Sequence, residues 1–277
     1  MGHTRLGVLP ESRRWNRIRE LLAEGAGASA VGAQTLRAIR ELFGNADESS
    51  YGPLGRDQAA AAGVWVLFSI PREARKADDL GAFKRALAGL GMSLTDDAFD
   101  SPASFIARVS DAVRDQARAQ QTTTFTEMSI LALRQTLTDA TLKSPLPLFR
   151  SEPDEIRARW AEYGTNAGFS QLASSFFSNL LERSISFYLS KELPQQVGAT
   201  ARFDHFASTE AFVSDLRVWC RERASITDEF ASVWLSKERF AHERSRGSDA
   251  LDLQDARRFL TYALAKVGGE VAAHDQG

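Results

Sequence analysis

The sequence has little of several residue types on which common chemistries depend. Its 277 residues include one cysteine, Cys220, and four histidines. A single cysteine excludes a disulfide within the chain and a four-thiolate metal site. No two histidines stand four residues apart, so the His-Glu-x-x-His arrangement of zinc hydrolases is absent. We therefore expect no metal and no cofactor.

Motifs for phosphate binding and for serine nucleophiles are also missing. The sequence contains no Gly-x-x-x-x-Gly-Lys loop, no Gly-x-Gly-x-x-Gly turn between a strand and a helix, and no Gly-x-Ser-x-Gly elbow. The glycine-rich stretch 25–32 (GAGASAVG) precedes a predicted helix, where backbone N–H groups can hold an anion. No lysine follows it, and we interpret 25–32 as a loop between helices.

Cys220 allows two interpretations. Arg217, Arg221 and Arg223 are near in sequence, and positive charge of this kind lowers the pKa of a thiol and activates it. No histidine lies within reach in the sequence. We therefore favour Cys220 as a small apolar residue that fills space beside a helical seam.

Long apolar runs of the kind that cross a membrane are not present. The stretch 59–70 has only twelve residues, too few for a helix to span roughly 30 Å of hydrocarbon. The stretch 164–181 is long enough but carries several serines, asparagines and glutamines, which are costly to bury in lipid. The first ten residues have no apolar run that would indicate a secretory signal. We expect no membrane span and a cytoplasmic location.

Charge is nearly balanced, at a formal net value of −2. Residues 1–40 carry seven arginines and three glutamates (+4), whereas residues 41–100 carry six basic and ten acidic residues (−4). Arg13, Arg14 and Arg17 form a small basic face on the first predicted helix, which is a candidate contact for phosphates or for an acidic partner. A solvated face is the simpler interpretation, and nucleic-acid binding is not favoured. Arginine outnumbers lysine 28 to 6, which we attribute to a GC-rich, bacterial genome.

Apolar residues recur at helical spacing through most of the sequence, and no alternating segments indicate a sheet. The fold class predicted is all-α, a multi-helix bundle of roughly nine to ten helices. A break at 92–101 predicts two lobes, a helical N-terminal lobe over 1–95 and a bundle with long helices over 102–277. The predicted helices cover 11–23, 31–43, 59–70, 79–90, 101–113, 127–142, 151–160, 166–192, 208–243 and 252–267.

Several details of these helices follow from local signals or stay open. Pro71 predicts the end of the third helix, and Gly268 and Gly269 predict the end of the last. Residues 64–70 suit a buried strand as well as a helix, although the preceding alanines favour a helix. Residues 209–245 form either one helix or two, because Ser225 and Asp228 are able to cap a second helix.

Two apolar features are candidates for contact with a partner protein. Phe176 and Phe177 are adjacent and point to different sides of their helix, and Phe187 and Tyr188 follow them. The second feature is a gapped heptad seam from Phe212 to Phe240, which packs on the chain's own helices or on another copy. Packing within the chain's own core is the alternative for both.

The leading hypothesis for function is a non-catalytic cytosolic protein that acts as an interaction or adaptor subunit of a larger bacterial assembly. It predicts a protein partner or a homo-oligomer. The first alternative is a nucleic-acid-binding accessory protein that uses Arg13, Arg14 and Arg17. The second is an enzyme, for example a nuclease, whose polar residues converge only in the folded structure, with His205 or His242 beside carboxylates.

Overall fold

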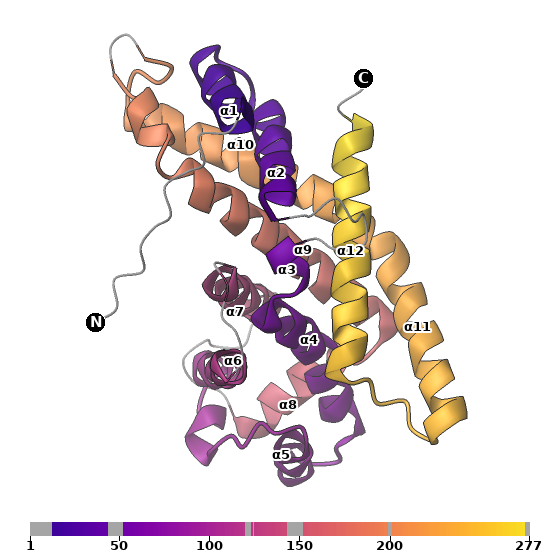
Figure 1. Ribbon diagram of the computed structural model, residues 1–277. Helices are drawn as coiled ribbons and strands as arrows, with labels where there is room; N and C mark the ends of the chain where they lie inside the picture. Colours follow the sequence, from indigo (N-terminus) through magenta and orange to yellow (C-terminus); the bar gives the residue numbers. More distant parts are fainter. Residues whose placement is uncertain are drawn as a thin grey trace.

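The computed structural model of the protein describes residues 13–43, 52–119, 123, 125–142, 152–198 and 201–274, and these residues are helical almost throughout (Figure 1). An all-α multi-helix bundle is confirmed. Two 3-10 turns, η1 (Asp96–Phe99) and η2 (Leu193–Gln196), lie between helices. The α-helices are α1 (Arg13–Ala23), α2 (Ala28–Phe43), α3 (Gly52–Gly55), α4 (Gln58–Lys76), α5 (Leu80–Gly89), α6 (Pro102–Arg118), α7 (Thr126–Leu142), α8 (Pro153–Glu162), α9 (Asn166–Leu189), α10 (Phe206–Ala224), α11 (Ile226–Arg246) and α12 (Leu253–His274).

Helix α9 is the centre of the bundle. It crosses the middle of the molecule, with α10 and α11 beside it (Figure 1), and it also packs on α7. The Ser170 hydroxyl donates to the backbone oxygen of Asp228 (2.9 Å), and Arg217 lies 2.9 Å from Glu182. Helix α9 therefore runs antiparallel to the pair α10 and α11, and its apolar face supplies much of the core.

Residues 209–245 form two helices that meet at Ser225. The backbone of Ser225 stays close to helical values (φ −61°, ψ −23°), so α11 continues from α10 with only a local break. The Ser225 N–H donates to the Arg221 carbonyl (3.1 Å), and the Asp228 N–H donates to the Ser225 carbonyl (2.9 Å). This change from a four-residue to a three-residue hydrogen bond is the tightening typical of a helix end.

The predicted heptad seam divides at the same break. Phe212, Leu216 and Trp219 on α10 are buried within the chain. On α11, Val233 is 53% exposed and Phe240 is 66% exposed. The first half of the seam therefore packs on the chain's own helices, as one of the two alternatives predicts, and the second half reaches the surface.

Pro71 does not end its helix, contrary to the prediction, because α4 continues to Lys76. A proline inside a helix removes one backbone hydrogen bond and costs about 3 kcal/mol. Pro71, Ile70 and Ala74 are all buried, so packing on both sides of the proline offsets that cost. The same helix includes residues 64–70, which settles the choice between strand and helix in favour of the helix.

Gly268 and Gly269 do not end the last helix either, since α12 continues to His274. The apolar face of α12 continues past the two glycines, because Val267 before them and Val271 after them are both buried. Each glycine in a helix interior costs about 1 kcal/mol relative to alanine. Burial of the valine beyond the two glycines offsets this cost.

The glycine-rich stretch 25–32 is a loop only in its first part. Helix α2 begins at Ala28, so Gly32 lies inside it and not in the predicted loop. A Cβ atom at Gly32 would stand 2.9 Å from Leu216 and 3.0 Å from Trp219. The glycine therefore allows side chains of α10 to pack directly against the backbone of α2, which is a packing role.

The predicted boundary at 92–101 contains η1, between α5 and α6. Helix α4, on one side of this boundary, packs against α6, α7, α8 and α12 on the other side. The buried apolar side chains of both parts belong to one cluster. The division into lobes 1–95 and 102–277 stays a prediction. Separating the two lobes would expose the residues of α4 that pack against the second part of the chain.

None of the described helices combines the length and the apolar character that a membrane span requires.

Asp249, in the connection between α11 and α12, predicts an acid-sensitive contribution to stability. Its carboxylate accepts hydrogen bonds from Arg72 (2.5 Å) and Lys76 (2.6 Å) of α4, and these bonds hold its pKa well below the ordinary value. A lowered pKa in the folded state stabilises the protein above about pH 4 and is lost as the pH falls below it. We expect Asp249→Asn to lower the free energy of unfolding by about 1 kcal/mol at pH 7. In urea titrations this difference should shrink from pH 4 downward, and a difference independent of pH would contradict the assignment.

Candidate functional site

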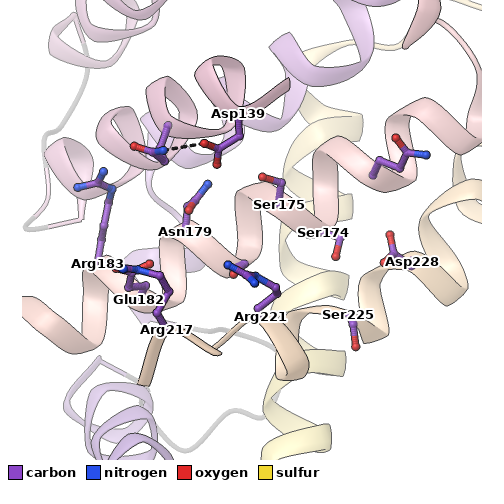
Figure 2. A pocket seen from close by; sticks show the side chains of 13 residues that line it. Asp139, Ser174, Ser175, Asn179, Glu182, Arg183, Arg217, Arg221, Ser225 and Asp228 are labelled. Atoms are coloured by element: carbon purple, nitrogen blue, oxygen red, sulfur yellow. Dashed lines mark hydrogen bonds and ion pairs between the residues drawn. The ribbon is translucent and has the colours of Figure 1, made fainter. Parts of the chain in front are cut away.

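A groove with polar walls opens where α7, α9 and α10 meet the start of α11. Its volume is about 680 Å³. Figure 2 shows its side chains converging from these helices. We call it the polar groove, and the described residues that line it are Gln135, Asp139, Gln171, Ser174, Ser175, Ser178, Asn179, Glu182, Arg183, Arg217, Arg221, Ser225 and Asp228.

One end of the polar groove carries most of its positive charge. Its arginines are Arg183 of α9 and Arg217 and Arg221 of α10; Arg217 lies beside Glu182, and the Arg183 side chain extends toward α7 (Figure 2). Arg217 and Glu182 form an ion pair at 2.9 Å. No ion pair or hydrogen bond joins the side chain of Arg183 or Arg221 to another residue that the structure describes. We call these four residues the arginine end.

The floor of the polar groove is a row of hydroxyl groups from α9. Ser174, Ser175 and Ser178 are half-buried, and their hydroxyls form no hydrogen bond within the described part of the chain. Hydroxyls in helices outside the groove, such as Thr35 of α2 and Ser110 of α6, donate to the carbonyl four residues earlier. The groove serines are therefore available to a ligand.

The sequence of α9 explains why the polar groove forms. Its phenylalanines and leucines recur on the face that enters the core, where Phe176 and Phe177 have no exposed surface. Its serines and Asn179 recur at spacings of three and four on the opposite face. Because α7 and α10 flank α9 on either side, that polar face becomes the floor of a groove.

The basic face predicted on the first helix is only partly described. Arg13 and Arg14 lie in the first turn of α1, and their side chains are outside the described part of the structure. Arg17 is exposed and contacts Glu20 (3.1 Å) and Glu24 (3.4 Å). Its guanidinium group is thus shared by two carboxylates, which weakens its attraction for phosphate. Nucleic-acid binding by this face stays untested.

The four aromatic residues proposed as partner contacts pack inside the chain. Phe176 and Phe177 contact each other edge to face (5.6 Å between ring centres) within the core. Tyr188 is buried against Trp15 (5.3 Å), and burial raises the pKa of its hydroxyl to about 12. Phe187 is half-buried and stacks edge to face on Tyr188. These positions agree with the alternative of core packing, and their role toward a partner stays untested.

Cys220 and His205 have local roles. Cys220 is fully buried, and burial together with the Glu182 carboxylate raises the pKa of its thiol far above the ordinary value. It is therefore poorly suited to be a nucleophile, which agrees with the role of apolar filler. His205 begins α10, where its ring accepts from the Ser208 N–H (3.3 Å).

His242 lies beside carboxylates, in a cluster whose possible ligand atoms lie within 4.8 Å of one another. The cluster consists of His242, Glu238 and Asp255. The His242 Nδ1–H donates to the Ala250 carbonyl (3.0 Å), and Nε2 lies 3.3 Å from Asp255. The Arg258 guanidinium contacts both carboxylates, so a positive charge already occupies the place that a cation would take. The cluster joins the end of α11 to the start of α12 and fits a metal ion poorly.

The polar groove was not predicted from the sequence. The signal that could have indicated it is the polar stripe on α9, which in the sequence alone counts only against a membrane span. Its arginines come from two helices, with Arg217 and Arg221 lying 34 and 38 residues after Arg183, and they form no motif. Comparisons with protein family models, with curated proteins and with solved structures found no match.

Proposed function

We propose that this protein is a non-catalytic interaction subunit of a larger bacterial assembly in the cytosol, and that it binds a segment of a partner protein in the polar groove. The observation that carries the proposal is a set of polar side chains that line the groove and form no hydrogen bond or ion pair within the described structure. These include the guanidinium groups of Arg183 and Arg221 and the hydroxyls of Ser174, Ser175 and Ser178. The volume of about 680 Å³ lies in the range of ligand sites.

The charges of the polar groove favour a protein segment over a nucleic acid. Asp139, Glu182 and Asp228 face the groove together with its three arginines. A phosphate backbone is negative along its whole length, so carboxylates spread along the groove would repel it. A polypeptide carries charges of both signs and also hydrogen-bonding backbone groups, which suit serine, asparagine and glutamine side chains.

The residue types of the groove favour binding over catalysis. None of its described lining residues is a histidine or a cysteine. A serine hydroxyl needs a neighbouring base to act as a nucleophile. Ser174, Ser175 and Ser178 form no hydrogen bond to such a base among the described residues. Their chemistry therefore supports recognition of a ligand.

Blocking the groove tests this proposal. Ser178→Trp places an indole over the floor of α9, and we expect it to abolish binding of the proteins that co-purify with the wild type. Native mass spectrometry of the purified wild-type and variant complexes measures the loss. Ser236→Trp is the matched control, because Ser236 is exposed on α11 outside the groove. Thermal melts verify that both variants fold.

Two outcomes would contradict the proposal. One is a wild-type protein that stays a strict monomer with no co-purifying protein. The other is a Ser178→Trp variant that retains the same partner at the same occupancy as Ser236→Trp.

A further inference from the structure

The outer face of α11 carries large apolar side chains that reach the surface. Helix α11 packs chiefly on α9 and α12 and lies at the edge of the bundle (Figure 1). Val233 is 53% exposed and Phe240 is 66% exposed. They are seven residues apart, which is close to two turns, so they share one face of the helix. The buried Leu235 lies on the opposite face.

The apolar surface continues sideways onto α12. Phe230 of α11 contacts Tyr262 edge to face (4.9 Å between ring centres), and Tyr262 is 40% exposed. Phe230 lies three residues before Val233 and therefore on a neighbouring part of the helix surface. Single exposed apolar residues are ordinary, whereas neighbouring ones mark a contact site. The exposed face of α11 is therefore a candidate interface.

The charged residues of this face are ordered by sign along the helix. Glu229 precedes Val233 by four residues, Lys237 follows it by four, and both charged side chains are exposed. Eight residues of helix separate the two charges by about 12 Å, too far for an ion pair within one helix. No residue three or four positions from either one carries the opposite charge. An antiparallel copy of α11 reverses the order and brings opposite charges together.

We propose that α11 pairs with α11 of a second copy of the chain, antiparallel and about a two-fold axis at Val233. This axis sets the two Val233 side chains against each other and Phe240 of each copy opposite Ile226 of the other. Glu229 of each copy then lies opposite Lys237 of the other, which forms two symmetric ion pairs. Pairing Val233 with Phe240 instead would bring the two Lys237 side chains together, and their repulsion opposes that arrangement.

The inference goes beyond the proposed function and does not depend on it. The residues of the exposed face of α11 are not among those that line the polar groove, and they lie outside its arginine end. The second copy is favoured over another protein because the face is complementary to itself in charge and in its apolar side chains.

A charge exchange, followed by sedimentation velocity over a dilution series, tests the pairing. We expect the wild type to dimerise. Glu229→Lys and Lys237→Glu each set like charges opposite one another and should raise the dissociation constant of the dimer about tenfold. The double variant restores opposite charges in exchanged positions and should return the constant to near the wild-type value. Glu210→Lys, on an exposed residue of α10, is the control and should change nothing.

A cysteine at the axis tests the register. Cys220 is the only native cysteine and is fully buried, so it does not compete. A disulfide requires Cβ atoms about 4 Å apart, which is expected only for residues at the axis. With copper(II) phenanthroline as oxidant, we expect Val233→Cys to form a covalent dimer on a non-reducing gel. Ser214→Cys, on an exposed residue of α10, should stay monomeric.

Three results would overturn the inference. One is a wild type that sediments as a monomer at every concentration, including the case in which Val233→Asp loses a different co-purifying protein. The second is a dimer that both charge reversals leave unchanged, which would place the contact elsewhere. The third is a double variant that does not recover.

The groove variants separate this inference from the proposed function. Ser178→Trp blocks the polar groove and should leave the dimer intact. Ser236 stands at the edge of the exposed face of α11, so the indole of Ser236→Trp should hold the two helices apart and weaken the dimer while the groove still binds. Failure of one proposal therefore leaves the other standing.

Discussion

Replacement of Asp57 by alanine is expected to lower the free energy of unfolding by about 4 kcal/mol. Asp57 begins α4 and is fully buried. One carboxylate oxygen accepts from the Ala60 N–H (2.9 Å), and the other accepts from the hydroxyls of Thr123 (2.6 Å) and Thr126 (2.8 Å). A single side chain therefore caps α4 and holds the start of α7.

The size of the effect follows from what the alanine leaves behind. Both threonine hydroxyls already accept a hydrogen bond from a backbone N–H. The Thr123 N–H donates to the Thr126 hydroxyl, and the Phe125 N–H donates to the Thr123 hydroxyl. Their own protons have Asp57 as acceptor, so its removal leaves the buried hydroxyl of Thr126 and the half-buried hydroxyl of Thr123 without an acceptor. A buried donor without a partner costs about 1–3 kcal/mol, and the lost helix cap adds about 1 kcal/mol.

Asp79→Ala is the matched control for this prediction. Asp79 begins α5 and accepts from the Ala82 N–H (2.7 Å), but it is exposed and its cap is its only side-chain hydrogen bond in the described structure. We expect it to cost about 1 kcal/mol. Urea unfolding followed by circular dichroism measures both variants. Equal losses in the two would show that the threonine contacts contribute nothing.

Helix starts were predictable because their signals are local. The predicted helix 101–113 begins with Ser101 followed by Pro102, a local start signal, and in the structure the Ser101 hydroxyl accepts from the Ser104 N–H (3.1 Å) at the start of α6. Asp79 is the first residue of the predicted helix 79–90, and in the structure its side chain caps α5. In each case the capping side chain and the N–H that it accepts from are three residues apart, so no distant part of the chain decides the outcome.

Helix ends were less predictable because distant contacts decide them. Pro71 and the pair Gly268 and Gly269 are strong local stop signals, yet α4 and α12 continue through them. Packing of Ala74 and of Val271 against other helices outweighs the local preference. Sequence periodicity alone shows that these residues are apolar, but not what they contact.

The polar groove could not be predicted for the same physical reason. Its walls come from α7, α9, α10 and α11, and only the stripe on α9 is visible as a pattern in the sequence. Arg183 and Arg221 line the same groove only because α9 and α10 pack side by side. The fold class therefore follows from periodicity, whereas the candidate site follows from how the helices pack.

Gly168→Ala is expected to lower the free energy of unfolding by about 2–3 kcal/mol, although alanine is the better helix former. Gly168 lies in the first turn of α9, where its N–H donates to the Thr165 hydroxyl (2.9 Å). A Cβ atom there would lie 2.5 Å from the carbonyl oxygen of Tyr163 and 2.6 Å from its Cα. These are backbone atoms, so no rotation of a side chain relieves the overlap.

The turn between α8 and α9 has little freedom to move. Tyr163 is buried, and its hydroxyl donates to the Ala140 carbonyl of α7 (3.1 Å). The adjacent Gly164 stands so close to α4 that a Cβ atom would lie 2.7 Å from the Pro71 carbonyl oxygen. A shift that accommodates alanine at Gly168 must therefore disturb contacts to both α4 and α7.

Gly269→Ala supplies a control of opposite sign. Gly269 lies within α12, and a Cβ atom there would meet no atom within 4 Å. Without a steric overlap, the only effect is that alanine favours the helix more than glycine does. We therefore expect the free energy of unfolding to rise by about 0.5–1 kcal/mol. Thermal and urea unfolding of the two variants should move in opposite directions. If both alanines stabilise the protein, the close approach of Tyr163 to α9 is wrong, and with it the placement of the helix that forms the groove floor.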